Sequence, residues 1–287
     1  MARPTKSIET VKIQRRTPDS TARARDVVSI EEPMEIRLAI PGASGTAPRE
    51  DRVVSIAVTM RTPGEDFELA AGFLVTEGVL TAREQVRELT YCRSGRGDQE
   101  YNIVEVRLQP GIQVDLERLS RNVYTTSSCG VCGKASLEAV EVQGCARVPD
   151  GTLVVDGQVL ASLPRRLLEE QDDFTRTGGL HAAGLFDEAG SALLVREDVG
   201  RHNAVDKVLG ASFLEGRLPL LHAALVVSGR VSFEVVQKAV VAGVPIVAAV
   251  GAPTSLAVEL ARRFNVTLAG FVRDGGYNLY SGEDRVR

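Results

Sequence analysis

The chain contains 287 residues, of which 44% are hydrophobic and 5% aromatic, with no tryptophan, and its formal net charge is −4. The apolar fraction is ample for a globular core, while the scarcity of aromatic side chains argues against a stacking surface for single-stranded nucleic acid. The charge is uneven, because residues 1–26 carry seven Lys and Arg against three acidic residues, whereas the remainder of the chain is near −8. An acidic body is a poor surface for nucleic acid, so we expect no nucleic-acid partner.

The basic head, residues 1–26, lacks the apolar stretch of a secretory signal, and we expect a disordered tail there. The longest apolar run, residues 239–250, contains Gly243 and Pro245 and is too short to span a bilayer. The four cysteines are too few for a disulfide-stapled secreted protein. These features predict a soluble, cytoplasmic protein without a membrane partner.

Residues 27–125 are predicted to form an α+β region, because runs rich in Val and Ile surround one amphipathic segment. In that segment Thr62 is the expected helix cap, Pro63 suits the first turn and Glu65 completes a capping box. The helix is expected to end near Glu77. The predicted strands of this region are 27–40, 52–60, 88–92 and 101–108.

Residues 126–146 are predicted to form a loop and a short helix that hold the most informative motif of the chain. The stretch Ser127–Lys134 reads Ser-Ser-Cys-Gly-Val-Cys-Gly-Lys, so Cys129 and Cys132 are separated by two residues and followed by a lysine. A helix N-terminus and a nearby ammonium group both favour the thiolate, which is the form that attacks sulfur or binds a metal. The motif therefore predicts sulfur chemistry.

Residues 147–287 alternate between apolar strand patterns and amphipathic helix patterns, which predicts a layered α/β domain with a partly parallel sheet. A small hairpin is expected around Asp156-Gly157. The predicted strands are 180–186, 192–195, 220–227, 244–250, 266–272 and 277–280. The predicted helices are 164–174, 202–213, 232–242 and 254–263.

Ligands of open α/β sheets bind beyond the carboxyl ends of the strands, so the turns at those ends are expected to surround one cleft. The first of the four turns, residues 196–203, has the sequence Arg-Glu-Asp-Val-Gly-Arg-His-Asn. Such a segment is ordinarily a solvated turn followed by a capped helix, but the mixture of positive and negative charges favours a ligand role here. Arg230 and Arg273 are placed to bind an anionic phosphate, with glycines allowing close approach. His181 is either a proton donor or a core histidine. The four turns are 196–203, 228–230, 251–254 and 273–276.

The cysteine pair admits three interpretations. A zinc half-site needs two more ligands, but no second C-x-x-C is present and the three histidines are scattered, so we expect no metal site. A thioredoxin-like redox pair normally follows a strand of a compact domain. A sulfur carrier needs a movable nucleophilic thiol, which the small residues around the pair supply. A zinc deaminase is improbable because no Glu follows His181 in an H-x-E pattern, and Cys92 and Cys145 are expected to be inert thiols.

Several longer segments, spread over residues 28–282, resemble the FdhD family of formate dehydrogenase accessory sulfurtransferases. The basic head is the one departure, since the core of that family does not require it. The matching segments are Glu31–Arg37, Met60–Asp66, Ser127–Lys134, Thr177–Ala183, Arg196–Lys207, Ser228–Glu234 and Ala252–Ala257.

The resemblance implies a sulfurtransferase that accepts sulfur from a cysteine desulfurase as a persulfide. It would deliver this sulfur to the molybdenum cofactor, Mo-bis(molybdopterin guanine dinucleotide), as formate dehydrogenase requires. It implies that Cys129 carries the persulfide and that Cys132 is its partner thiol. It also implies a homodimer and a later domain similar to the cytidine deaminase fold. The cofactor-binding stretch of the family falls on Phe271, Val272, Arg273, Asp274, Gly275 and Gly276, and we add Arg230, Arg201, His202 and His181 as weaker candidates.

Two other functions stay open. A cofactor chaperone would bind and protect the molybdenum cofactor without moving sulfur, and would tolerate replacement of both cysteines by serine. A thiol–disulfide oxidoreductase would need both thiols and would reduce a generic disulfide.

Overall fold

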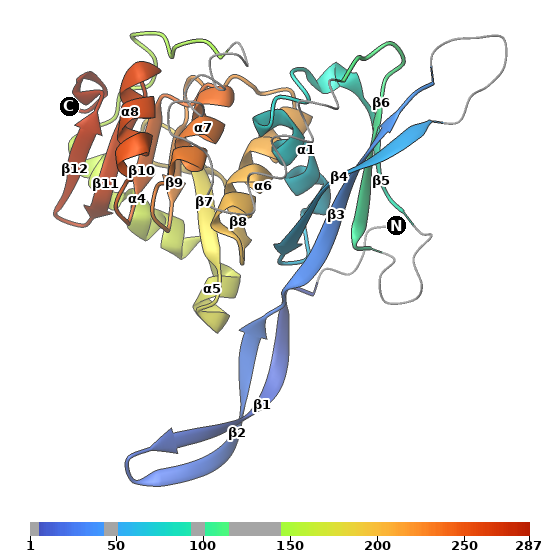
Figure 1. The fold of residues 1–287 in the computed structure, drawn as a ribbon. Helices are drawn as coiled ribbons and strands as arrows, with labels where there is room; N and C mark the ends of the chain where they lie inside the picture. Colours follow the sequence, from blue (N-terminus) through green and yellow to red (C-terminus); the bar gives the residue numbers. More distant parts are fainter. Residues whose placement is uncertain (1–5, 43–50, 93–100, 115–144) are drawn as a thin grey trace.

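The computed structural model describes residues 6–42, 51–92, 101–114 and 145–287. Figure 1 shows two lobes, each built on one β-sheet, and a two-stranded arm that projects from their junction. Within the described ranges, no helix has the length and apolar character needed to cross a membrane.

The first lobe is a four-stranded sheet in the order β4-β3-β6-β5, with β3 parallel to β6 and the other pairs antiparallel. Alternation along β3 turns Met34, Ile36 and Leu38 towards the face covered by helix α1, where they share a core with Leu69 and Leu74. The strands predicted over 52–60, 88–92 and 101–108 are confirmed to within two residues. The elements are β3 (Glu32–Ile40), β4 (Arg52–Arg61), α1 (Asp66–Thr76), the 3-10 helix η1 (Arg83–Gln85), β5 (Val86–Tyr91) and β6 (Ile103–Leu108).

The second lobe is a six-stranded sheet in the order β12-β11-β10-β9-β7-β8. Strands β9, β10 and β11 are parallel to one another, whereas β7 is antiparallel to both β8 and β9, and β12 is antiparallel to β11. The predicted partly parallel α/β sheet is therefore confirmed. Its strands are β7 (His181–Phe186), β8 (Ala192–Asp198), β9 (Ala224–Val227), β10 (Ile246–Ala249), β11 (Thr267–Arg273) and β12 (Gly276–Ser281).

Helices cover both faces of this sheet (Figure 1). Helices α6, α7 and α8 share one buried cluster with one face, and α4 shares a second cluster with the other. Residues of β9 and β10 are buried on both sides, which explains their nearly continuous apolar sequence. The helices are α4 (Gly157–Glu169), α5 (Asp172–Thr177), α6 (Arg201–Leu214), α7 (Phe233–Val241), α8 (Ser255–Arg263) and the 3-10 helix η3 (Glu283–Arg285).

The hairpin predicted around Asp156-Gly157 is wrong, because helix α4 begins there. The Asp156 carboxylate accepts a hydrogen bond from the Gln158 N–H at 2.7 Å and so caps the helix. Leu160, Leu163 and Leu167 then follow at helical spacing and are buried under the sheet. The predicted helix over 164–174 is in fact the end of α4 followed by the separate short helix α5.

The predicted start of helix α1 is also wrong. The helix begins at Asp66, after Glu65 in a left-handed conformation with φ of 51°. Thr62 does not cap it, because its hydroxyl accepts from the Val199 N–H at 3.2 Å and its own N–H donates to the Asp198 carboxylate at 3.1 Å. Thr62 therefore joins the two lobes, and the capping-box pattern was a false signal.

The disordered tail predicted over residues 1–26 is replaced, from Ile8 onward, by the antiparallel arm of β1 (Ile8–Thr17) and β2 (Ser20–Ser29). The turn at Pro18-Asp19 joins the strands, and their register runs without a shift from Ile8↔Ser29 to Thr17↔Ser20. The strand predicted over 27–40 is accordingly divided between β2 and β3. Val11 and Ile13 of β1 alternate with polar residues, which is a strand pattern, but the high charge of the segment favoured a disordered tail.

The lobes meet where helix α1 crosses helix α6. A Cβ atom on Gly72 would overlap the carbonyl oxygen of Asp206, and one on Gly210 would overlap that of Glu68, so the two backbones are in direct contact. Phe213 of α6 belongs to the core of the first lobe. The two sheets are therefore parts of one packed body.

Candidate functional site

One edge of the second sheet gathers the turns that the sequence predicted to carry a ligand. Strands β8 to β11 end at this edge and β7 begins there (Figure 1). The Gly251 N–H donates to Gly229 O and the Phe271 N–H donates to Gly251 O, and each N···O distance is 3.1 Å. The Ser228 hydroxyl accepts from the Ala182 N–H at 2.9 Å. The turns after β9 and β10 and the end of β11 therefore lie side by side.

His181 opens β7 at this edge. A Cβ atom on Gly229 would lie 3.5 Å from His181 Nδ1, its nearest neighbour, so this glycine leaves room beside the imidazole. Burial, and then the positive charge of Arg201, lower the pKa of His181 below its ordinary value. At neutral pH the side chain is an uncharged imidazole that can donate or accept a hydrogen bond.

His202 lies in the first turn of α6, with its Nε2 atom 3.0 Å from Glu234 Oε2 and 3.2 Å from Ser232 Oγ. Burial first, and then the charges of Lys238 and Arg201, lower the pKa of His202 to about 4. We assign the proton to Nε2, because the Glu234 carboxylate can only accept. His202 is therefore a neutral imidazole held in one orientation.

Three arginines supply positive charge along the edge. Arg230 and Arg273 are exposed, in the turn after β9 and at the end of β11. Arg201 is half-buried, and its Nε atom has no hydrogen-bond partner in the described part of the chain. Together they make the edge suitable for an anionic group such as a phosphate.

The turn 196–203 contains more internal structure than the sequence predicted. The fully buried Asp198 carboxylate accepts from the N–H groups of Thr62 and Gly200, at 3.1 and 2.8 Å, and from Asn203 Nδ2 at 2.9 Å. It also forms an ion pair with Lys207 Nζ at 2.9 Å. Asp198 and Asn203 therefore hold the turn in place, and only Arg201 and His202 are left to meet a ligand.

Sequence reasoning missed the buried lysines behind this turn. Lys207 Nζ also donates to Thr62 O at 3.0 Å, and Lys238 Nζ is 2.8 Å from the Asp206 carboxylate. Asp206 also accepts from Thr76 of α1 at 2.9 Å. Asp206, Lys207 and Lys238 fall within helical patterns, and only their charge at core-facing positions could have identified them.

Comparison of this chain with protein families and with known sequences and structures identifies its family. The model of the FdhD/NarQ family matches residues 52–287. A relative named sulfur carrier protein FdhD from Streptomyces avermitilis is 51% identical over 264 residues, which cover 91% of this chain and 89% of the relative.

This chain belongs to the FdhD/NarQ family.

Two further matches extend over nearly the whole chain. The sulfur carrier protein FdhD of Mycobacterium tuberculosis is 45% identical over 281 residues, covering 96% of this chain and 97% of the relative. The crystal structure of a protein assigned as a formate dehydrogenase accessory protein from Desulfotalea psychrophila has a TM-score of 0.74 and 26% identity, and it covers 98% of this chain and 100% of that one. These matches support the fold, while the likeness to cytidine deaminases stays a prediction.

The two cysteines on which the family resemblance places the sulfur, Cys129 and Cys132, lie outside the described residues. Of the other thiols, Cys145 is half-buried and burial raises its pKa, which lowers the thiolate fraction at neutral pH. Cys92 is also half-buried. No cluster of three or more His, Cys, Asp and Glu suited to a metal occurs within the described ranges.

The stretch 271–276, on which the resemblance to FdhD proteins places the cofactor, forms the bulged end of β11 and the turn into β12. Phe271 is 45% exposed with φ of 53°, whereas Val272 is buried in the core and has only its backbone available. The Oδ2 atom of Asp274 lies 3.6 Å from the Nε atom of Arg165 in α4. Gly275 has φ of 98°, so the turn itself requires a glycine there.

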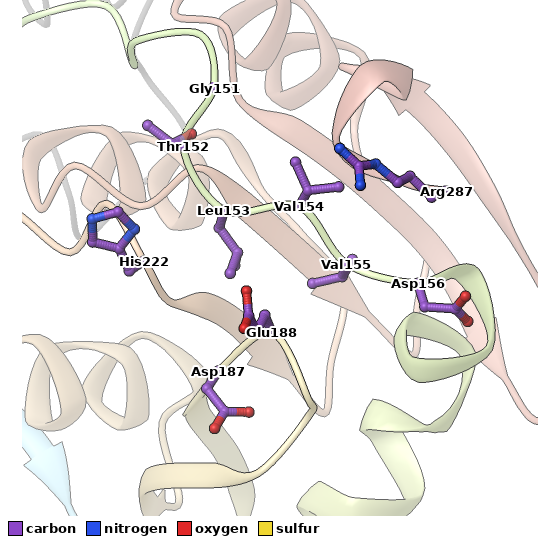
Figure 2. Close-up of a pocket in the computed structure, with 10 residues that line it drawn as sticks. All are labelled: Gly151, Thr152, Leu153, Val154, Val155, Asp156, Asp187, Glu188, His222 and Arg287. Carbon is purple, nitrogen blue, oxygen red and sulfur yellow. The ribbon is translucent and has the colours of Figure 1, made fainter.

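A cavity of about 800 Å³ lies at the opposite edge of the sheet (Figure 2). His222 precedes β9, Asp187 and Glu188 follow β7, and the segment 151–156 forms another wall. Figure 2 shows the carboxylates of Asp187 and Glu188 and the imidazole of His222 as separate groups around this space. The cavity is thus distinct from the edge that gathers His181, Arg201 and His202.

Proposed function

We propose that this chain is a sulfurtransferase that accepts sulfur from a cysteine desulfurase as a persulfide on Cys129. It passes this sulfur to Mo-bis(molybdopterin guanine dinucleotide), the cofactor that formate dehydrogenase requires. The observation that carries the proposal is the pair Cys129 and Cys132 inside the stretch matched by the FdhD/NarQ family model. Relatives at 45–51% identity are named sulfur carrier proteins. We further propose that it works in the cytoplasm as a homodimer.

The proposed loading step is a thiol–persulfide exchange. The Cys129 thiolate attacks the terminal sulfur of the desulfurase persulfide, a new S–S bond forms on Cys129, and the desulfurase cysteine leaves as a thiolate. No external oxidant is needed, because the terminal sulfur moves without a net change in redox state. Cys132 follows Cys129 three positions later in the sequence, and in this proposal its thiol assists release of the sulfur.

In this proposal the molybdenum cofactor is the acceptor substrate, and it binds at the edge of the second sheet that gathers the ligand turns. The exposed Arg230 and Arg273 would bind its phosphates, and the neutral imidazoles of His181 and His202 would donate or accept hydrogen bonds without adding charge. Arg201, whose Nε atom is without a described partner, is a further donor at the same edge. Phe271 offers an exposed ring to the planar parts of the cofactor.

Intact-protein mass spectrometry after incubation with an active cysteine desulfurase and L-cysteine tests the proposal. We expect one added sulfur atom on the wild type and on Cys145→Ser, the matched control, and none on Cys129→Ser. Subsequent addition of the molybdenum cofactor should remove that sulfur from the loaded protein. A wild type that never gains sulfur, but binds the cofactor, would instead favour a chaperone. Robust reduction of insulin would favour a thiol–disulfide oxidoreductase.

A further inference from the structure

Helices α6 and α7 are joined by two polar side-chain pairs that lie one turn apart. His202 of α6 meets Glu234 of α7, with 3.0 Å between Nε2 and Oε2. One turn further along both helices Asp206 meets Lys238, with 2.8 Å between Oδ1 and Nζ, and both side chains are buried. Residues four apart share one face of a helix. The buried pair therefore sets the register of the two helices and holds His202 against Glu234.

Glu234 decides which nitrogen of His202 carries the hydrogen. The imidazole is neutral at physiological pH because its pKa is about 4, and a carboxylate can only accept, so the hydrogen is on Nε2. The Ser232 hydroxyl, 3.2 Å from the same nitrogen, can rotate to suit either tautomer. Glu234 lies in the first turn of α7, where the helix dipole favours its charge. The opposite nitrogen of His202, Nδ1, therefore keeps its lone pair and can only accept.

The Nδ1 atom of His202 is open to a ligand. It forms no hydrogen bond with the residues that the structure describes and is not among their buried polar atoms, while 30% of the side chain is exposed. Arg201 and His181 both lie close enough for their charges to lower the pKa of His202. His181 pairs with Asp198 at the end of β8, just before the turn into α6. The free nitrogen therefore belongs to the edge that gathers the ligand turns.

A lone pair at this place selects against phosphate. The phosphates of a dinucleotide only accept hydrogen bonds, so they cannot bond to Nδ1, and the Glu234 carboxylate would repel them. The exposed Arg230, two positions before Ser232 in the turn after β9, suits a phosphate instead. The group that fits Nδ1 is a ring N–H. Guanine carries a ring N–H beside an amino group, and a pterin carries the same two donors, called here the donor edge.

We propose that Glu234 is a positioning residue that fixes His202 as a hydrogen-bond acceptor for the donor edge of a guanine or pterin ring. The inference rests on the proposed function, because it takes the molybdenum cofactor, which contains both rings, as the ligand. It divides the edge of the sheet into two parts. The arginines bind phosphate, and His202 with Glu234 recognises a ring by its donors.

Nitrogen NMR of the full chain reads the tautomer directly, and only three histidines need assignment. In the wild type we expect the Nδ1 shift of His202 to be that of an unprotonated nitrogen. In Glu234→Ala the two ring-nitrogen shifts should move towards each other, because the hydrogen is no longer held on Nε2. Glu234→Gln keeps an accepting oxygen and should keep the wild-type pattern. A hydrogen on Nδ1 in the wild type would overturn the proposal.

Calorimetric titration of the full chain tests recognition of the ring. Guanosine and adenosine diphosphates carry the same phosphates, but only guanine has the donor edge, so their affinity ratio isolates the ring. We expect the wild type to prefer the guanosine compound by about threefold to tenfold, as one hydrogen bond supplies. Glu234→Ala and His202→Phe should each lose this preference, and the double variant should lose no more than either. Glu259→Ala, which removes an exposed carboxylate from α8, is the matched control and should keep it.

A second titration distinguishes the two rings. If the pterin meets His202, the two diphosphates bind alike, and Glu234→Ala instead weakens binding of 6-hydroxymethylpterin by a similar factor, whereas Glu259→Ala does not. If Glu234→Ala changes neither the diphosphate ratio nor the pterin affinity, the proposal is overturned. Neither titration involves sulfur, so this failure would leave the loading of Cys129 to be judged by mass spectrometry alone.

Discussion

His202 occupies an acid-sensitive position in the proposed cofactor edge. Its pKa in the folded protein is about 4, mainly because of burial, whereas an unfolded chain titrates near the ordinary value of about 6.5. The unfolded state therefore binds a proton first as the pH falls, and folding stability is lost between about pH 6.5 and 4. Above that window His202 is neutral in both states and contributes no pH dependence.

We predict that His202→Gln removes part of the acid sensitivity of the protein. From the two pKa values, the wild type loses about 2 kcal/mol from this residue between pH 8 and pH 5, and the variant does not. Urea unfolding at both pH values measures the loss, and the values at pH 8 isolate any packing effect of the substitution. Raised pKa values of Glu65 and Glu197 act in the opposite direction in both proteins, so the difference between them is the informative quantity. Equal losses in the two proteins would contradict the assigned pKa.

The crossing of α1 and α6 depends on two glycines. We predict that Gly72→Ala and Gly210→Ala each destabilise the protein by about 1–3 kcal/mol, despite the better helix propensity of alanine. The added Cβ meets a backbone carbonyl, which cannot move aside as a side chain could. Gly276→Ala is the matched control, because its Cβ would meet nothing within 4 Å. Thermal unfolding should separate the two classes, and a neutral Gly72→Ala would contradict the close crossing.

At the scale of elements, apolar runs and periodic apolar patterns predicted most strands and the helices α6 to α8 to within a few residues. Capping patterns were less reliable. Thr62 and Glu65 match a capping box but serve the junction between lobes, and Asp156 caps a helix although Asp-Gly commonly marks a turn. Such motifs are local patterns. The hydrogen-bond partner of Thr62 is Asp198, far along the chain, and that of Asp156 is the Gln158 N–H in the first turn of the helix.

For the site, the sequence predicted the turns but could not divide them into supporting and exposed residues. Asp198 and Arg201 are three residues apart in the same polar segment, yet one is fully buried and the other half-buried. The difference arises because the first lobe packs against the turn and donates the Thr62 N–H to Asp198, while Lys207 of α6 forms an ion pair with the same carboxylate. Only tertiary contacts between distant segments contain that information.

Asp198 joins the two lobes of the molecule, so its replacement should lower the stability of both lobes. The carboxylate receives donors from the first lobe, from its own turn and from Lys207, all buried. In Asp198→Asn the side-chain amide has only one oxygen that can accept a hydrogen bond. Its NH₂ group replaces the second carboxylate oxygen and would lie against the donors that surround Asp198. Because Lys207 would then be buried without its carboxylate, we expect a loss of about 3–5 kcal/mol.

The same substitution should also separate the unfolding of the lobes. In the wild type Phe213 of α6 lies in the core of the first lobe, so hydrogen exchange in both sheets should report one cooperative opening. In Asp198→Asn we expect peptides from β3 and β6 to exchange before those from β9 and β10, because the first lobe has the smaller core. Thr177→Ala, which removes a hydrogen bond at the base of the arm, should leave both sheets coupled. Uniform exchange in Asp198→Asn would mean that the helix crossing alone couples the lobes.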